Sequence, residues 1–240
     1  MNISRRRVRA IFRKELRDFR RNRSVVWAMA VIPLVFLIQP VVLVKKLSAT
    51  DASFLLHSHV LLYMLAIPAL VPALVAAFAV VGERMQATLE PVLTTPIRRE
   101  ELLLGKALAA FVPAVGVAYV VYAGFLGYVK LFADPAVASA LVRGPDIIAQ
   151  VIFTPLVAAW SIWLGIGIST RLSDTRAAQQ LGMLASLPTV VVTSLTAFDV
   201  IHPSLGLAIG AAALLLLLDV SGWRLVSLLL DRERLITGTR

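Results

Sequence analysis

Cysteine is absent from this chain of 240 residues, and only 16% of the residues are charged. The absence of cysteine excludes disulfide bonds and metal sites built on thiolates. The scarcity of charge is accompanied by 59% hydrophobic residues and a mean hydropathy of +0.84. This balance is more apolar than that of an ordinary water-soluble domain, so the composition predicts a membrane protein.

Six apolar runs are each long enough to cross a bilayer core about 30 Å thick, which takes about 20 helical residues. We expect an all-α fold of six transmembrane helices joined by short loops, forming one domain over residues 1–240. The first run is longer than the apolar core of a signal peptide, and we expect it to remain as an anchor. The runs lie near residues 24–44, 58–82, 105–131, 147–170, 178–198 and 204–224.

Lysine and arginine are distributed unevenly about these runs. With a cytoplasmic N-terminus, twenty of the 24 basic residues fall on the inner side and four on the outer side, as the positive-inside rule requires. We therefore expect both termini in the cytoplasm of a cell with this protein in its plasma or inner membrane. The asymmetry explains the net charge of +10 without nucleic-acid binding, and the bias of arginine over lysine favours a bacterial source.

Ten of the basic residues precede Ser24, and apolar residues recur among them at helical spacing. This pattern predicts an amphipathic helix over residues 3–20 that lies along the inner leaflet, where anionic headgroups attract arginine. We expect its apolar stripe to face the lipid; the alternative is a basic segment that only sets the topology. The stripe consists of Val8, Ile11, Phe12, Leu16 and Phe19.

A charged, turn-rich segment separates the second and third runs. Thr88 is suited to cap a short helix over residues 88–94, whose first turn contains a proline and an acidic residue. Thr95 can cap a second helix with Pro96 at its first position, and this helix would run through Glu101 into the third span. Such a segment predicts a rigid contact on the membrane surface.

The same segment reads Thr-Leu-Glu, then Leu-Thr-Thr-Pro, then Arg-x-Glu-Leu-Leu-Leu-Gly-Lys, and it resembles the first cytoplasmic loop of the type-2 ABC transporter permeases. Residues 11–23 are similar to the opening elbow helix of that family, and residues 173–181 and 231–237 are similar more weakly. Ala87 stands where many relatives have glycine. The resemblance implies that residues 88–96 form the coupling helix, which contacts a separate ATPase. The residues implied in coupling are Thr88, Leu89, Glu90, Pro91, Leu93, Thr95, Pro96, Arg98 and Glu101.

One side of the fifth run is polar. Its residues recur at helical offsets, so they share a face that should not contact lipid. The face either lines a translocation path or bonds to a neighbouring helix. It consists of Gln179, Ser186, Thr189, Thr193 and Thr196. On the third run, Ala123 and Gly127 offer a surface for close helix packing.

A phosphate-binding loop is missing, because Gly105-Lys106 is followed by Ala107 and lacks the upstream glycine. ATP and Mg would therefore be bound by a partner chain, and this chain would be no enzyme. The resemblance implies the permease subunit of an ABC exporter that pairs with itself or with a sister permease. The alternatives are a mechanical or regulatory membrane subunit that passes no solute, and an ion-driven secondary transporter.

Ionisable residues deep in the spans, which a proton relay would need, are not expected. Glu83 and Asp219 fall near the inner ends of their runs. We expect Asp219 to form an ion pair with Arg224; the alternative is a role in gating or in binding substrate. His57 and His59 flank the start of the second run on the outer side, and we expect both to be solvated. No set of metal ligands is predicted.

Overall fold

The computed structural model describes residues 3–47, 55, 58–85 and 98–229. Within these residues the fold is helical without strands, and six helices are long and apolar enough to span a membrane. The predicted fold class is therefore confirmed. The elements are α1 (Arg5–Arg21), α2 (Arg23–Lys46), the 3-10 helix η2 (Val60–Leu65), α4 (Ala66–Met85), α6 (Arg99–Phe132), α7 (Pro135–Leu141), α8 (Gly144–Ser169), α9 (Thr175–Ala197) and α10 (Leu205–Leu229).

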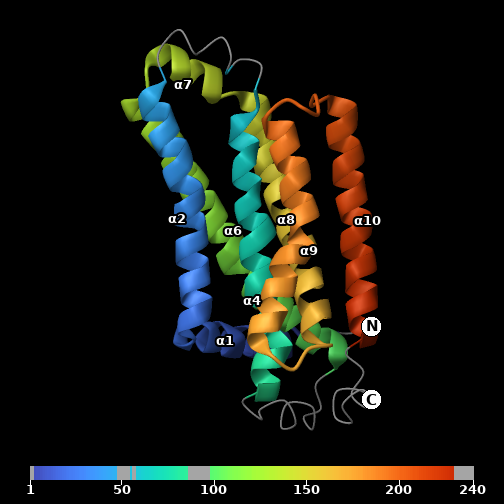
Figure 1. The fold of residues 1–240 in the computed structure, drawn as a ribbon. Helices are drawn as coiled ribbons and strands as arrows, with labels where there is room; N and C mark the ends of the chain where they lie inside the picture. The colour runs from blue at the N-terminus through green and yellow to red at the C-terminus, as the bar shows by residue number, and fades with distance from the viewer. Residues whose placement is uncertain (1–2, 48–54, 56–57, 86–97, 230–240) are drawn as a thin grey trace.

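The six long helices stand side by side, with α1 lying across one end of the bundle and α7 at the other (Figure 1). The start of α1 and the end of α10 lie at the same end. Helix α6 has 34 residues, which corresponds to about 50 Å at 1.5 Å per residue. Because a bilayer core is about 30 Å thick, α6 must extend beyond it, and its first turns reach the level of α1.

Helix α4 forms the centre of the bundle, where its side chains from Ala66 to Ala77 are almost all buried. Glycines let the neighbouring helices approach it. A Cβ on Gly165 of α8 would lie 2.6 Å from the carbonyl oxygen of Ala73, and one on Gly182 of α9 would lie 3.3 Å from the same atom. Small residues at such contacts are typical of membrane helices. Helices α8 and α9 are thus fixed against α4 through backbone proximity.

The prediction that Ala123 and Gly127 of the third span form a close-packing surface is wrong within the described residues. Ala123 is exposed, and no atom lies within 4 Å of a Cβ built on Gly127. The small residues that permit close approach belong to α8 and α9 instead, because these two helices flank the buried α4.

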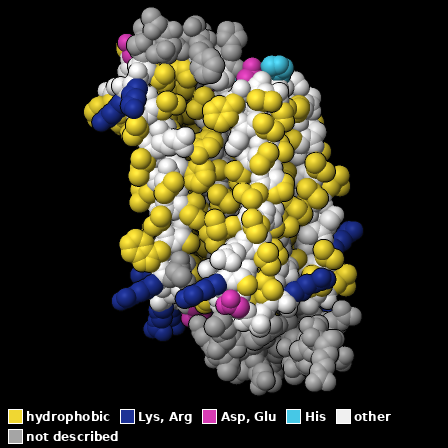
Figure 2. Space-filling view, viewed as in Figure 1, with side chains coloured by type: hydrophobic (Ala, Val, Ile, Leu, Met, Phe, Trp, Pro, Cys, Tyr) yellow, Lys and Arg dark blue, Asp and Glu magenta, His cyan; other side chains and the backbone are white. Residues whose placement is uncertain are grey.

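The outer surface of the bundle is apolar. Figure 2 shows hydrophobic side chains across the middle of one face, with Lys and Arg gathered toward its margins. Large side chains such as Leu34 of α2, Leu187 of α9 and Leu217 of α10 are exposed. So large an apolar surface is unfavourable in water and matches a lipid environment.

The predicted amphipathic helix is present as α1, but its stripe does not face outward. Val8, Ile11 and Phe19 are buried, and a Cβ on Gly105 of α6 would lie 2.5 Å from Cγ2 of Ile11. The expectation that these side chains contact lipid is therefore wrong, because α6 covers them. Leu16, at the flank of the stripe, is only half-buried.

Candidate functional site

The predicted coupling segment meets the described structure at the N-terminus of α6. Of its nine residues, Arg98 and Glu101 are described; the others lie outside the described residues. Arg98 has an extended backbone (ψ 150°), so α6 begins at Arg99 and the helix expected to pass through residue 98 starts after it. The backbone N–H of Arg98 donates to Oε2 of Glu101 at 3.2 Å. This contact satisfies a donor at the helix start.

Glu101 also joins α6 to α1. The backbone N–H of Ser4 donates to Oε1 of Glu101 at 2.8 Å, and Nη1 of Arg7 lies 3.3 Å from its Oε2. The Glu101 side chain is only 1% exposed. Its carboxylate lies in the first turn of α6, where the helix dipole favours negative charge. One side chain therefore caps α6 and holds the beginning of α1.

A second contact between the two helices is a buried ion pair. Nζ of Lys106 on α6 lies 2.9 Å from Oε1 of Glu15 on α1, with the side chains 1% and 4% exposed. Lys14 reaches the same oxygen at 3.3 Å. Removing one member of a buried pair leaves an uncompensated charge, which typically costs about 3–5 kcal/mol. The pair therefore fixes the position of α1 on α6.

This pair was not predicted from the sequence, although one signal pointed to it. Glu15 lies in the stripe of Val8, Ile11 and Phe19 at helical spacing, so an acidic residue occupies a position that is otherwise buried. A buried carboxylate requires a partner. Lys106 is 91 residues away, and no local pattern identifies it.

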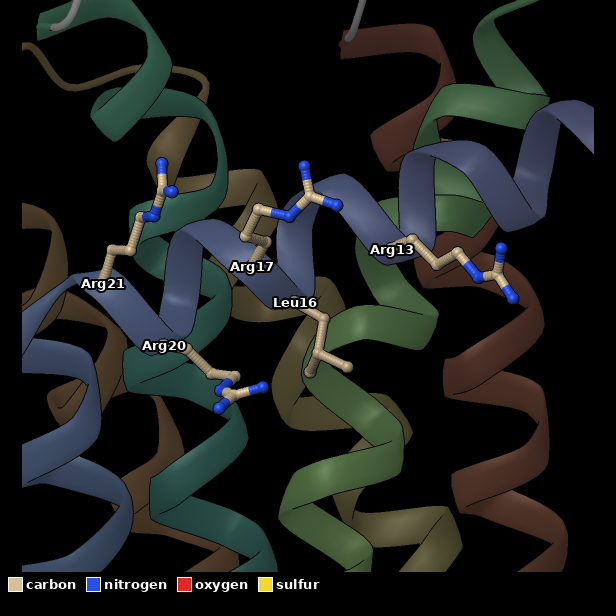
Figure 3. A pocket seen from close by; sticks show the side chains of 5 residues that line it. All are labelled: Arg13, Leu16, Arg17, Arg20 and Arg21. Atoms are coloured by element: carbon tan, nitrogen blue, oxygen red, sulfur yellow. The ribbon is translucent and has the colours of Figure 1, made fainter.

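The outward face of α1 carries arginines. Arg13, Arg17, Arg20 and Arg21 surround Leu16 and line an open cavity of about 550 Å³. Figure 3 shows Leu16 and Arg20 pointing along the flank of the bundle, while Arg17 and Arg21 point the opposite way. None of the four arginines forms an ion pair within the described residues. Because like charges at i,i+4 repel by about 0.2–0.5 kcal/mol, this face favours an external anion.

The predicted polar face of α9 divides into two parts. Ser186 is buried and donates to the carbonyl oxygen of Gly182 at 3.0 Å, while Gln179 is half-buried. Neither lines the cavity that α9 forms with its neighbours. This part of the face packs toward α4, because Gly182 contacts Ala73.

Thr189, Thr193 and Thr196 line a cavity of about 430 Å³ between α8, α9 and α10. Thr193 and Thr196 donate to carbonyl oxygens of their own helix, at 3.0 and 2.9 Å. Their hydroxyls are thus satisfied without another helix, and the remaining wall is almost entirely apolar, with Trp160 and Leu215 among its residues. The structure therefore brings three of the five predicted residues together at one cavity of ligand size.

At the opposite end of the bundle, a polar cluster joins η2 to α8. Nδ1 of His59 lies 2.6 Å from Oδ1 of Asp146, and Nη2 of Arg143 lies 2.9 Å from Oδ2 of the same carboxylate. Arg143 also donates to the carbonyl oxygen of Ser58. The expectation that His59 is solvated is wrong, because the buried Asp146 requires partners. His57 lies outside the described residues.

The predicted ion pair between Asp219 and Arg224 is not formed by these two described side chains, because a separation of five residues places them about 140° apart around a helix. Oδ1 of Asp219 is enclosed and has no hydrogen-bond partner in the described structure. The residue lies ten positions before the end of α10, deeper than predicted. Glu83 lies in the last turn of α4, but its side chain is not described.

Groups of three or more potential metal ligands are absent from the described parts of the chain. Residues 9–221 match the family profile described as "ABC-2 family transporter protein". A search of curated proteins found no significant match.

Proposed function

The chain belongs to the ABC-2 family of transporter proteins, and from this membership we propose that it is the membrane-spanning permease subunit of an ABC exporter. In this proposal a separate ATPase subunit binds ATP and Mg. The permease works as a pair, with itself or with a sister permease, and carries no catalytic residues.

The family match carries the assignment as a permease, and the double attachment of α1 to the first turns of α6 supports coupling to an ATPase. Residues 88–96, the proposed ATPase contact, are followed within a few residues by Glu101, which holds Ser4 and Arg7. The buried pair of Lys106 and Glu15 lies just over one turn further. A push on residues 88–96 would therefore move the start of α6 and α1 together, as one rigid unit.

The unit formed by α1 and the start of α6 packs against α4 at the centre of the bundle. Phe19 of α1 shares a buried apolar cluster with Leu103 of α6 and Val75 of α4. Helix α4 is in turn fixed against α8 and α9 through Gly165 and Gly182, and these two helices line the 430 Å³ cavity. A contiguous packed route thus runs from the start of α6, which follows the proposed ATPase contact in the sequence, to the proposed path residues Thr189, Thr193 and Thr196.

The arginine face of α1 supports a cytoplasmic position for this end of the bundle. Arginine near an anionic leaflet gains about 1 kcal/mol per residue, and α1 and the end of α10 lie at the same end of the bundle (Figure 1). This supports our proposal that both termini lie in the cytoplasm, with anionic lipid as a further partner. The proposal of a bacterial cell membrane rests on the bias of arginine over lysine.

The proposal is tested by expressing the chain with an affinity tag in its source organism, purifying it from the membrane and identifying any ABC ATPase that is retained with it. We expect the ATPase to co-purify and its hydrolysis to increase when the two are reconstituted in lipid vesicles. Glu15→Leu should reduce this stimulation strongly, while the exposed Arg9→Gln on the same helix should not. Co-purification without uptake of any solute by inside-out vesicles would favour the regulatory subunit, and transport without an ATPase would favour the secondary transporter.

A further inference from the structure

The cavity between α8, α9 and α10 lies in the half of the bundle away from α1. Of its lining residues, Thr196 is one residue before the end of α9, and Leu207 is two residues after the start of α10. Both of these helix ends lie opposite α1 (Figure 1). On α10 the lining continues to Leu218, about 16 Å from Leu207 at 1.5 Å per residue. The cavity is therefore about as deep as one leaflet, which is half of a bilayer core about 30 Å thick.

Helix α10 is attached to the bundle by its other half. Its buried residues are Gly222 and Val226, and a Cβ on Gly222 would lie 2.8 Å from Cβ of Trp163 on α8. In the described stretch from Leu205 to Leu218, no residue is buried. The half of α10 that lines the cavity is thus not packed into the bundle, and the space between α9 and α10 is open to a ligand.

The cavity is too narrow for a further helix. A volume of about 430 Å³ over a depth of about 16 Å corresponds to a mean width of about 6 Å, whereas a helix with its side chains is about 10–12 Å wide. An unbranched hydrocarbon chain is only one methylene group wide. The dimensions of the cavity therefore match a single extended hydrocarbon chain that enters from one leaflet.

The wall of the cavity favours hydrocarbon over water. Phe153, Val192 and Leu214 are typical of its lining, and its described lining residues include no charged side chain. Thr193 and Thr196 donate their hydroxyl hydrogens to their own helix, whereas a buried water needs two to four polar partners. Because unfilled apolar space destabilises a protein in proportion to its volume, a ligand that fills the cavity is stabilising.

We propose that this cavity binds one acyl chain of a phospholipid from the leaflet opposite α1, with the headgroup at the adjoining ends of α9 and α10. The cavity recognises the chain and not the headgroup, in contrast to the arginine face of α1. Such binding requires neither ATP nor transport. The inference therefore does not rest on the proposed function.

The test uses the purified protein in lipid nanodiscs that contain a small fraction of phosphatidylcholine with a photoreactive diazirine midway along one acyl chain. After irradiation, mass spectrometry identifies the labelled residues. We expect residues 188–196 and 207–218 to be labelled at least threefold more than residues 34–42 of α2, where side chains such as Ile38 are exposed to bulk lipid. A phosphatidylglycerol probe with the same chain should label the cavity equally, because no charge in the described lining distinguishes the headgroups.

Variants of α10 test whether the cavity itself holds the chain. Ala211→Phe and Ala208→Phe each place a ring in the cavity and should lower its labelling at least fivefold. The matched control is Ala213→Phe, because Ala213 is exposed on the same helix and does not line the cavity; it should be labelled like the parent. After washing in detergent, native mass spectrometry should find one phospholipid fewer on Ala211→Phe than on the parent and on Ala213→Phe.

Labelling of the cavity no stronger than that of α2, or full labelling in either folded phenylalanine variant, would overturn the assignment. If Ala211→Phe does not fold, as judged by its elution and thermal unfolding, Ala208→Phe decides the matter. Stronger labelling by the phosphatidylglycerol probe would contradict recognition of the chain alone. If a photoreactive amino acid in place of Thr193 links two copies of the chain and the lipid probe does not label the cavity, a second copy fills it and the inference is wrong.

Retention of the ATPase is scored separately on the same preparation. A chain that retains its ATPase but is not labelled in the cavity refutes this inference alone. A chain that is labelled there but retains no ATPase refutes the proposed function alone.

Discussion

Nζ of Lys106 and Oε1 of Glu15 lie 2.9 Å apart in a contact that is almost closed to solvent. The pair connects α1, which lies across the bundle, to the beginning of α6, which spans it (Figure 1). Since each charge is buried, each depends on the other for compensation. The position of α1 is therefore set by a specific polar contact in addition to its apolar stripe.

This contact predicts that replacing one of its two charged residues destabilises the protein more than replacing both. Lys106→Met alone should destabilise the protein by about 3–5 kcal/mol, because it leaves Glu15 buried with only the half-exposed Lys14 beside it. Lys106→Met combined with Glu15→Leu should recover much of that loss, since both buried charges are removed. The measurement is thermal or denaturant unfolding in detergent. Lys14→Met, which breaks a pair that is 40% exposed at the lysine, should cost less than about 1 kcal/mol, and equal losses for Lys14→Met and Lys106→Met would contradict this account.

The hydrogen bonds of Glu101 predict that its replacement lets the starts of α1 and α6 open more often. Glu101→Ala removes the acceptor of three hydrogen bonds, from Ser4, Arg7 and Arg98. The first turn of α1 and the start of α6 should then open more often, so hydrogen exchange of their amides should become faster while α8 stays protected. Glu100→Ala is the matched control, because the neighbouring carboxylate caps neither helix in the described contacts. Unchanged exchange in α1 after Glu101→Ala would show that this carboxylate does not hold the helix.

The spans were predictable from the sequence because length and apolarity are local properties. Helices α8 and α9 lie within a few residues of the predicted runs. Local patterns could not show which residues, distant in the chain, each helix contacts. Whether α1 faces lipid or α6 depends on a glycine at position 105 that is far away in the chain, and His59 looked solvated because Asp146 is 87 residues distant.

The candidate site was likewise predictable where it depends on helical spacing, and not where it depends on contacts between distant helices. The polar face of α9 follows from helical spacing, and three of its threonines do share a cavity. That Ser186 packs instead depends on how close α9 lies to α4, which Gly182 permits. The roles assigned to residues 88–96 came from resemblance, and they remain predictions because these residues lie outside the described structure.

The arginine face of α1 predicts a dependence on anionic lipid. Changing Arg13, Arg17 and Arg20 to glutamine should reduce the anionic phospholipid that co-purifies and weaken the effect of phosphatidylglycerol on ATPase stimulation. The matched control is the same change at Arg5, Arg6 and Arg9, which removes equal charge from α1 outside the cavity of Figure 3. Native mass spectrometry of the retained lipid checks the prediction. If both triple variants lose lipid equally, the effect is one of net charge and the cavity has no special affinity.

The threonines of α9 predict a change in selectivity without a loss of stability. Thr189→Val and Thr193→Val preserve volume closely, and Thr193 bonds only to its own helix, so assembly should remain intact. If these side chains line the path, the relative rates of export of different solutes should change. The control is Thr175→Val at the start of α9, far from the cavity. An unaltered ratio of rates in the double variant would assign these residues to packing.

The proposed coupling segment predicts uncoupling without unfolding. Thr88→Gly replaces the predicted helix cap, but glycine is a tolerated cap and should cost only a few tenths of a kcal/mol. Glu90→Arg places a cation at the positive end of the predicted short helix and reverses the charge expected to face the partner. The double variant should therefore insert into the membrane and unfold at the same temperature as the parent, yet associate weakly with the ATPase and stimulate little hydrolysis. Arg176→Glu, a charge reversal in the first turn of α9, is the control for a general change of charge on that surface. Normal ATPase association and transport by the double variant would remove residues 88–96 from the coupling role, and the attachment of α1 to α6 would then have to receive the ATPase through another surface.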